Sequence, residues 1–259
     1  MTDTVTDTAT YPSPLDDVAL AASWNAAWSA LGRQAPAGLR AELMNAWAEP
    51  HRHYHDQRHL RECLALWARW RGQCQCQCQC PCPCPCPCPC QCQCQCQCQC
   101  QGAGAGASAS AGEVAVALWV HDAICDPRAG DNELNSAAWA ARSLIRAGLP
   151  SETAQRVHDL VMATQHNAPA DLAAGADAQL LVDIDLSILG SPPERFERYD
   201  QDVRKEYAWV PGLRYRTRRA QVLQGFLDRP RLYHGEAART LLERQARINL
   251  VAALSRLAQ

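Results

Sequence analysis

Histidine and aspartate side chains gather in four short segments of this sequence. In EPHRHYHDQRHL, residues 49–60, His55 and His59 stand four residues apart and therefore share one face of a helix. His59 also continues an apolar stripe through Cys63 toward Leu66, which directs its ring inward. Two histidines spaced in this way are more often ordinary core or surface residues than ligands, so their meaning depends on what other ligands the chain supplies.

The second segment, LWVHDAICD, carries His121 followed directly by Asp122. Its surroundings are apolar, and a buried carboxylate there requires a cation, either an arginine or a metal ion that also binds the neighbouring imidazole. The third segment, LLVDIDLSILG, holds Asp183 and Asp185. Because the neighbours of Asp185 one helical turn away are apolar, we expect Asp185 to be the more deeply buried, with Asp183 behind the ligands or on the helix surface.

The fourth segment, VHDLVMATQHN, contains a second His-Asp pair, His158 and Asp159, and then His166. The helix expected here is amphipathic and has room for polar residues on its outer face, so we interpret this pair as unrelated to a site. His166 stands at the expected helix end, close to the Thr164 hydroxyl, and is the better candidate for a site residue.

Taken together, His59, His121, Asp122 and Asp185 form a mixed nitrogen and oxygen ligand set for one divalent cation. Such a set leaves positions open for water and for a substrate oxygen. Mixed ligation by histidine and aspartate suits Mn²⁺, Fe²⁺, Co²⁺ or Zn²⁺, and the histidines make Mg²⁺ less favoured.

Helical periodicity must position these residues. Ser13, Pro14 and Asp16 predict the start of a first helix, which carries Trp24 and Trp28 on one side. Alternating strand patterns are missing outside one dipeptide repeat, so the predicted fold class is an all-α helical bundle. Further helices are expected at about 36–47, 55–70, 113–124, 131–148, 151–167, 177–190, 194–208, 215–228 and 235–257.

The dipeptide repeat holds every cysteine except Cys63 and Cys125, out of 16, alternating with glutamine or proline over residues 73–101. A metallothionein-like or redox module is one interpretation, but a thiolate cluster needs turns around each ion, and the prolines keep the chain extended. We interpret the repeat as an insert without a function of its own, whose thiols bind soft metals adventitiously. With the Gly, Ala and Ser residues that follow, it makes a low-complexity insert over 73–112.

The insert interrupts what we expect to be a single domain, residues 13–259, after a disordered N-terminus of residues 1–12. A formal net charge of −2 gives no reason to expect a nucleic acid as a stable partner. No apolar run reaches the length of about 18 residues that a membrane span needs, and the start of the chain lacks the features of a secretion signal. A soluble, cytoplasmic protein is therefore the expectation, and its oligomeric state stays open.

The order His, then His-Asp, then Asp on expected helices resembles the HD superfamily of metal-dependent phosphohydrolases, whose ligands come in that order on a helical bundle. PHRHYHDQRHL, ALWVHDAICDPRAGDNELNSA, DIDLSILG, YDQDVRKEYAWVP and ARINL resemble a bacterial family of HD phosphohydrolases, some of whose members carry a glutamate-receptor-subunit name. The resemblance runs from about residue 20 to the end. Asp56 stands where many relatives have Asn, and Cys125 where an aromatic residue is usual; neither change removes a ligand.

The resemblance implies a metal held by His59, His121, Asp122 and Asp185, which activates a water molecule to hydrolyse a phosphate ester of a small metabolite or nucleotide. It also implies that His55 is the general acid, acting beside Asp122 at the reaction centre. For the substrate, Arg204 and Tyr207 are the first candidates among the basic residues of the second half. Glu133 and Ser136 orient ligands or a water molecule, or else cap a helix near Asp131.

Two other functions remain open. A di-iron oxygenase of the HD type requires further histidine ligands, for which only His158 and His166 are candidates. A catalytically degenerate HD protein that binds a nucleotide as a regulator is the other, although such sites usually lose a ligand and this chain has all four.

Overall fold

The computed structural model describes residues 11–71, 109–165 and 175–259, and over these residues the chain is helical without any strand. This confirms the predicted all-α class. The helices are α1 (Asp17–Ala30), α2 (Leu39–Ala46), α3 (Gln57–Trp70), α4 (Ala109–Val120), α5 (Asn132–Arg146), α6 (Ser151–Met162), α7 (Ala176–Asp185), the 3-10 helix η2 (Leu186–Gly190), α8 (Pro193–Glu206), α9 (Gly212–Leu227), α10 (Glu236–Ala238), the π-helical turn η3 (Arg239–Glu243) and α11 (Arg244–Leu257).

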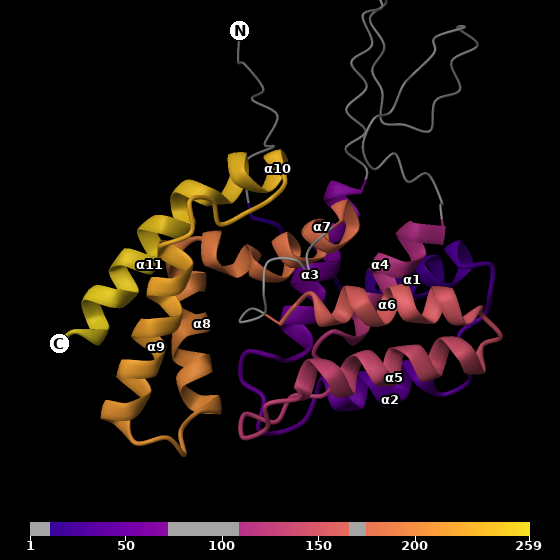
Figure 1. Ribbon diagram of the computed structural model, residues 1–259, viewed down its shortest axis with the longest axis horizontal. Coiled ribbons are helices and arrows are strands. Elements are labelled where there is room, and N and C mark those ends of the chain that lie inside the picture. The colour runs from indigo at the N-terminus through magenta and orange to yellow at the C-terminus, as the bar shows by residue number, and fades with distance from the viewer. Residues whose placement is uncertain (1–10, 72–108, 166–174) are drawn as a thin grey trace, which may run out of the picture.

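Helix α4 lies at the centre of the bundle, where it contacts α1, α3, α5, α6 and α7. From Val114 to Val120 its side chains are all apolar and buried, as expected for a helix that is covered all round. In Figure 1 the helices α1, α2, α4, α5 and α6 lie on one side of α3 and α7, and α8, α9 and α11 lie on the other. Side chains at the ends of the central helices therefore meet inside the bundle.

Helix α4 begins four residues earlier than the sequence predicts, at Ala109 instead of residue 113. Residues 109–112, which the sequence assigns to the low-complexity insert, form the first turn of this helix. A Cβ on Gly112 would stand 2.9 Å from the Ala27 carbonyl oxygen and 2.9 Å from Leu31 of the neighbouring segment. The small residues of this stretch thus allow α1 and α4 to approach closely, which is why they belong to the helix.

The N-terminal segment also departs from expectation. Asp16, and not Ser13, is the N-cap of α1, because its carboxylate accepts a hydrogen bond of 2.8 Å from the Ala19 N–H. Tyr11, expected to be disordered, packs against the core, with its hydroxyl 3.4 Å from that of Ser187. Residues 1–10 and the whole repeat, 73–101, lie outside the described residues.

The C-terminal third forms the remaining wall of the bundle. The helix expected over 177–190 divides into α7 and η2, and the one expected over 235–257 divides into α10, η3 and α11. Gly190 lies where a Cβ would come within 2.7 Å of the Leu242 carbonyl oxygen, so the contact between η2 and η3 requires a glycine. Within the described part of the chain, no helix is both long enough and apolar enough to cross a membrane.

Candidate metal centre and its cavity

Four predicted ligands converge inside the bundle. His59 Nε2 lies 3.2 Å from His121 Nε2, 3.1 Å from Asp185 Oδ1 and 3.6 Å from Asp122 Oδ2. His121 Nε2 lies 3.2 Å from Asp122 Oδ2 and 3.5 Å from Asp185 Oδ1. Ligand atoms around a tetrahedral ion with bonds of about 2.0–2.2 Å are spaced by about 3.3–3.6 Å. The distances between the two imidazole nitrogens, and from each of them to the two carboxylates, are close to this range.

Cys63 adds a fifth donor, which the sequence places only in an apolar stripe. Its Sγ lies 3.7 Å from Nδ1 and 3.8 Å from Nε2 of His59, one helical turn earlier on α3. His59, Cys63, His121 and Asp185 offer ligand atoms that all lie within 4.8 Å of one another, and all four residues are buried. Burial, together with the charges of Asp185 and other nearby acids, raises the pKa of the Cys63 thiol well above its usual value. This buried group could bind a metal ion.

The outer nitrogens of both imidazoles have partners that orient the rings. The Leu118 carbonyl oxygen lies 2.9 Å from His121 Nδ1 and can only accept, so Nδ1 carries a hydrogen and Nε2 faces the cluster. The Tyr54 hydroxyl, 3.1 Å from His59 Nδ1, can accept in the same way. Such contacts fix the tautomer and the ring orientation of metal-binding histidines.

The charges of the cluster favour a cation at its centre. Burial lowers the pKa of His121, but the charge of Asp122 and the hydrogen bonds with Asp122 and Asp185 outweigh it and raise that pKa well above its usual value. Burial raises the pKa of Asp122, but the charge and hydrogen bond of His121 outweigh that effect and hold it well below its usual range. The two carboxylates therefore stabilise positive charge at this point, as a proton or as a metal ion.

Local structure brings the ligand segments together. Asp56 is the N-cap of α3 and accepts hydrogen bonds from the Arg58 and His59 N–H groups at 2.8 and 3.3 Å. Arg52, whose side chain is buried, donates to the carbonyl oxygens of Asp122 at 2.6 Å and Ala123 at 2.8 Å. Arg52 thereby joins the segment before α3 to the one after α4, a role with no signal in the sequence.

His55 is held by a residue that was not predicted, Glu206 at the end of α8. The Nδ1–H of His55 donates to Glu206 Oε2 at 2.8 Å, and Oε1 accepts the N–H groups of His53, Tyr54 and His55 at 2.8, 2.8 and 3.0 Å. Burial raises the pKa of Glu206, but the hydrogen bond and charge of His55 and these N–H groups lower it to about 2. Burial lowers the pKa of His55, yet hydrogen bonds with Cys125 and Glu206 raise it well above its usual value. These partners favour the imidazolium form of His55.

A cavity of about 590 Å³ adjoins the cluster. His55, Asp122 and Asp185 line it together with Glu133, from the first turn of α5, and Tyr207, at the end of α8. Tyr207, a candidate for contacting the substrate, and Glu133, predicted to orient ligands or a water molecule or else to cap a helix, thus both lie in this wall. The remaining wall is aromatic and cationic, with the members Tyr199, Trp209, Tyr215, Phe226, Arg214, Arg218 and Arg219.

The sequence placed Asp183 either behind the ligands or on the helix surface, and the structure excludes the surface position. Its side chain is fully buried, and it accepts hydrogen bonds from the N–H groups of His234 at 2.8 Å and Gly235 at 2.6 Å. Asp185 is 8 % exposed, because it faces the cavity, so the expected order of burial is reversed. Asp183 anchors the segment that precedes α10, and burial raises its pKa although its hydrogen bonds lower it.

Arg204, a candidate for contacting the substrate, does not line the cavity. Its guanidinium donates to the carbonyl oxygens of Tyr207 at 2.7 Å and Val210 at 3.2 Å and lies over the Tyr215 ring, so it fixes the turn between α8 and α9. Ser136 accepts a hydrogen bond from the Ile124 N–H at 3.0 Å and thereby holds the segment after the ligand pair. His166 lies outside the described residues.

Comparisons of the chain with family models, with curated proteins and with solved structures found no match. The meaning of the site therefore depends on its own geometry. Order along the chain was enough to predict that His59, His121, Asp122 and Asp185 meet, whereas Glu206 and Arg52 emerge only from the fold.

Proposed function

We propose that this protein is a metal-dependent phosphohydrolase that cleaves the phosphate ester of a small metabolite or nucleotide. The observation that supports this most strongly is that two of the predicted ligands, Asp122 and Asp185, line one cavity together with His55. Its volume of about 590 Å³ falls within the range of about 300–1,000 Å³ typical of small-molecule sites.

The residues of the cluster fit a transition-metal ion. A divalent cation held by His59, His121, Asp122 and Asp185 would polarise a phosphoryl oxygen and lower the pKa of a water molecule toward neutrality. Two imidazoles and two carboxylates favour Mn²⁺, Fe²⁺, Co²⁺ or Zn²⁺ over Mg²⁺. The Leu118 carbonyl and the Tyr54 hydroxyl hold both rings in place before any ligand binds, so the site is preorganised.

His55 provides the proton that the leaving oxygen of an ester needs. Its ring centroid lies 6.2 Å from that of the ligand His59, and its ring lines the cavity. Because Nδ1 is occupied by Glu206, the proton is donated from Nε2. The raised pKa keeps His55 protonated before the reaction, as a general acid requires.

The opposite wall of the cavity suits the organic part of an ester. Tyr199, Tyr207 and Tyr215 offer ring surfaces, and the hydroxyl of Tyr215 is buried without a hydrogen-bond partner among the described residues. Arg214 and Arg218 add positive charge on α9. This wall has the groups to bind a body that carries rings or further anionic oxygens.

The two rival functions receive less support. A di-iron oxygenase of the HD type needs additional histidines, and the metal-binding group among the described residues contains only His59 and His121. A regulator that has lost its chemistry has no need of a general acid, whereas Glu206 accepts four hydrogen bonds from residues 53–55, two of them from His55.

The test is a panel of phosphate monoesters and diesters with Mn²⁺, Fe²⁺, Co²⁺, Zn²⁺ and Mg²⁺, with metal content measured by mass spectrometry. We expect the wild type to turn over at least one ester with a transition metal, and His121→Ala to lose both metal and turnover. His158→Ala is the matched control, since it removes the other histidine of a His-Asp pair, and it should behave as wild type.

Other results of this panel would favour a different function or a different site. Tight metal binding without hydrolysis of any ester would contradict the hydrolase and favour the regulatory function. Oxygen consumption with a second iron would favour the oxygenase. Equal loss of activity in His121→Ala and His158→Ala would place the chemistry outside the cluster.

A further inference from the structure

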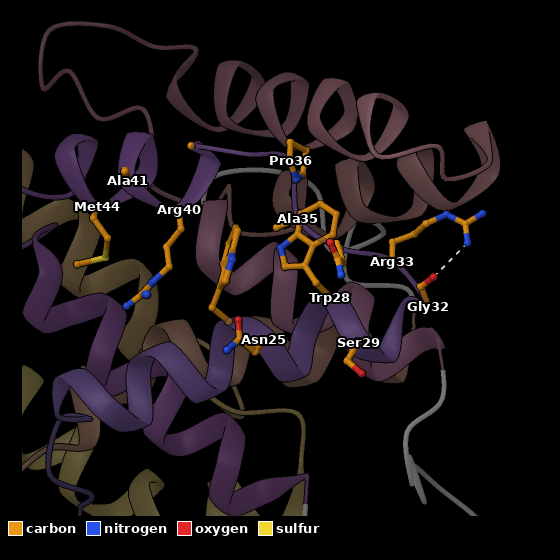
Figure 2. A pocket seen from close by; sticks show the side chains of 13 residues that line it. Asn25, Trp28, Ser29, Gly32, Arg33, Ala35, Pro36, Arg40, Ala41 and Met44 are labelled. Atoms are coloured by element: carbon orange, nitrogen blue, oxygen red, sulfur yellow. Dashed lines mark hydrogen bonds between the residues drawn. The ribbon is translucent and has the colours of Figure 1, made fainter.

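A second cavity lies between α1 and α2 and shares no lining residue with the one at the metal cluster. Its volume is about 1180 Å³, and Figure 2 shows the side chains that line it. Gly32 and Gly38, with φ of 66° and 81°, turn the chain between the two helices and form part of its wall. No aspartate, glutamate or histidine belongs to the described lining, so this cavity is no metal site.

Two buried donors in this wall have no acceptor. The Nε1–H of Trp28 and the Nε–H of Arg40 are covered and have no hydrogen-bond partner among the described residues, and Trp28 is only 2 % exposed. Such atoms are rare in folded proteins, and each calls for an explanation. The Tyr215 hydroxyl, which has the same character, lines the cavity at the metal cluster, where a ligand is expected.

The N-terminus of α2 points to the same kind of ligand. Its N-cap is Gly38, which has no side chain to cap the helix, and the backbone N–H groups of Arg40 and Ala41 have no partner among the described residues. Arg40 and Ala41 both line the cavity. Free N–H groups and the positive end of the helix dipole attract an anion.

The lining of this cavity carries positive charge and aromatic surface. Arg33 and Arg40 are the cations of the lining, and Arg40 forms no ion pair within the described part of the chain. Glu42, the acid of the first turn of α2, is exposed and does not belong to the lining. The rest of the wall consists of apolar side chains, among them Trp24 and Met44, and of the polar residues Asn25, Ser29 and Gln34. The tryptophan rings offer surfaces on which another aromatic ring packs well.

We propose that the cavity between α1 and α2 binds a small aromatic anion, whose charged group is held by the Arg40 guanidinium and the first turn of α2. Arg40 is only partly buried, so its guanidinium can turn toward a bound acceptor. The Trp28 Nε1–H provides a further donor for the same group. This site is independent of the hydrolase proposal, because it uses none of the residues of the metal cluster.

The test uses 1-anilinonaphthalene-8-sulfonate as the anionic probe, with the full chain, by fluorescence and calorimetric titration. We expect saturable binding to the wild type that weakens about tenfold or more in Arg40→Gln, because hydrogen bonds to a charged group are lost. Arg146→Gln removes the same charge from an exposed position on α5 and should leave the affinity unchanged. The neutral N-phenyl-1-naphthylamine should bind Arg40→Gln as it binds the wild type.

A second variant keeps the test decisive if Arg40→Gln folds poorly, as circular dichroism would reveal. Trp28→Phe keeps an aromatic ring but removes the Nε1–H, and it should weaken binding of the anionic probe a few-fold, by about the worth of one hydrogen bond. Wild-type affinity in both variants would overturn the proposal, since the probe would then bind elsewhere. Equal weakening in Arg40→Gln and Arg146→Gln would overturn it too, because net charge alone would explain the binding.

Discussion

The His-Asp dipeptide occurs three times in the chain, at residues 55–56, 121–122 and 158–159, and the last two copies differ in their surroundings. His121 and Asp122 follow the buried helix α4 and meet ligands from α3 and α7, with the His121 side chain 0 % exposed. His158 and Asp159 lie on α6, where the Asp159 side chain is 64 % exposed. Asp159 accepts a hydrogen bond of 2.8 Å from Gln155, one turn earlier on its own helix.

The difference shows that the surroundings, not the dipeptide, create a site. Charges in water interact weakly, so the exposed pair on α6 needs nothing beyond its own helix and solvent. Inside the bundle the field of two carboxylates is little screened, and it raises the pKa of His121 well above its usual value despite burial. Only the buried pair therefore has a need for a cation, and only there do partners from other helices supply further ligands.

The largest effect is expected from exchanging the aspartate of each pair. Asp122→Asn removes one ligand charge from the cluster, and we expect turnover to fall by about a thousandfold, together with metal occupancy, because the metal contributes several kcal/mol to such reactions. Asp159→Asn makes the same chemical change on the surface of α6, and its turnover should stay within about twofold of wild type. Steady-state kinetics and metal analysis of both variants measure the contrast.

A small effect of Asp122→Asn would break the comparison. If this variant keeps both its metal and its turnover, Asp122 is no ligand, and the set reduces to His59, Cys63, His121 and Asp185, whose ligand atoms lie within 4.8 Å of one another. Cys63→Ser would then be the variant that loses the metal.

The sequence predicts the ligands but not the residues that hold them. His59, His121 and Asp185 could be found because each interrupts an apolar stripe, and a helix of known period shows which way it faces. Glu206 belongs to a polar helix with ordinary charges around it, and it meets His55 across 151 positions of sequence. No local period encodes such a contact, because it depends on how α8 docks against the segment before α3.

Burial also depends on docking. Asp185 has the more apolar neighbours along the chain, yet the cavity lies beside Asp185, and the segment before α10 covers Asp183. The sequence assigns residues 109–112 to the low-complexity insert, since their small side chains offer little surface for packing. Their small side chains allow α1 to approach α4 closely. This close approach depends on how the two helices pack, and the sequence of residues 109–112 alone does not reveal it.

An intermediate effect is expected when the partner of His55 is changed. Glu206→Gln removes the charge that raises the pKa of His55, so this pKa should fall, and we expect turnover at neutral pH to drop by about a hundredfold, the usual worth of a general acid. A general acid must be protonated, so the basic limb of the pH–rate profile should move to lower pH. Metal content should not change.

The control for this variant is Glu49→Gln, in the same segment as His55. The Glu49 side chain is 44 % exposed and pairs with Arg52, so its loss should leave the pH–rate profile where it is in the wild type. A profile of Glu206→Gln that coincides with the wild type would show that His55 is not the acid, even if its turnover is lower.

The smallest effect is expected from replacing one of two arginines on α9. Arg218 and Arg216 are both exposed on α9, but only Arg218 lines the cavity, so the pair repeats on a smaller scale the contrast between the two His-Asp pairs. Because exposed charges interact weakly through solvent, Arg218→Gln should raise KM by only about two- to fivefold, with kcat unchanged. Arg216→Gln makes the same change in net charge and should leave KM as it is. Equal shifts in KM would mean that α9 attracts the substrate through its overall charge, whereas a fall in kcat for Arg218→Gln alone would mean that this guanidinium acts on the transition state as well as on the bound ester.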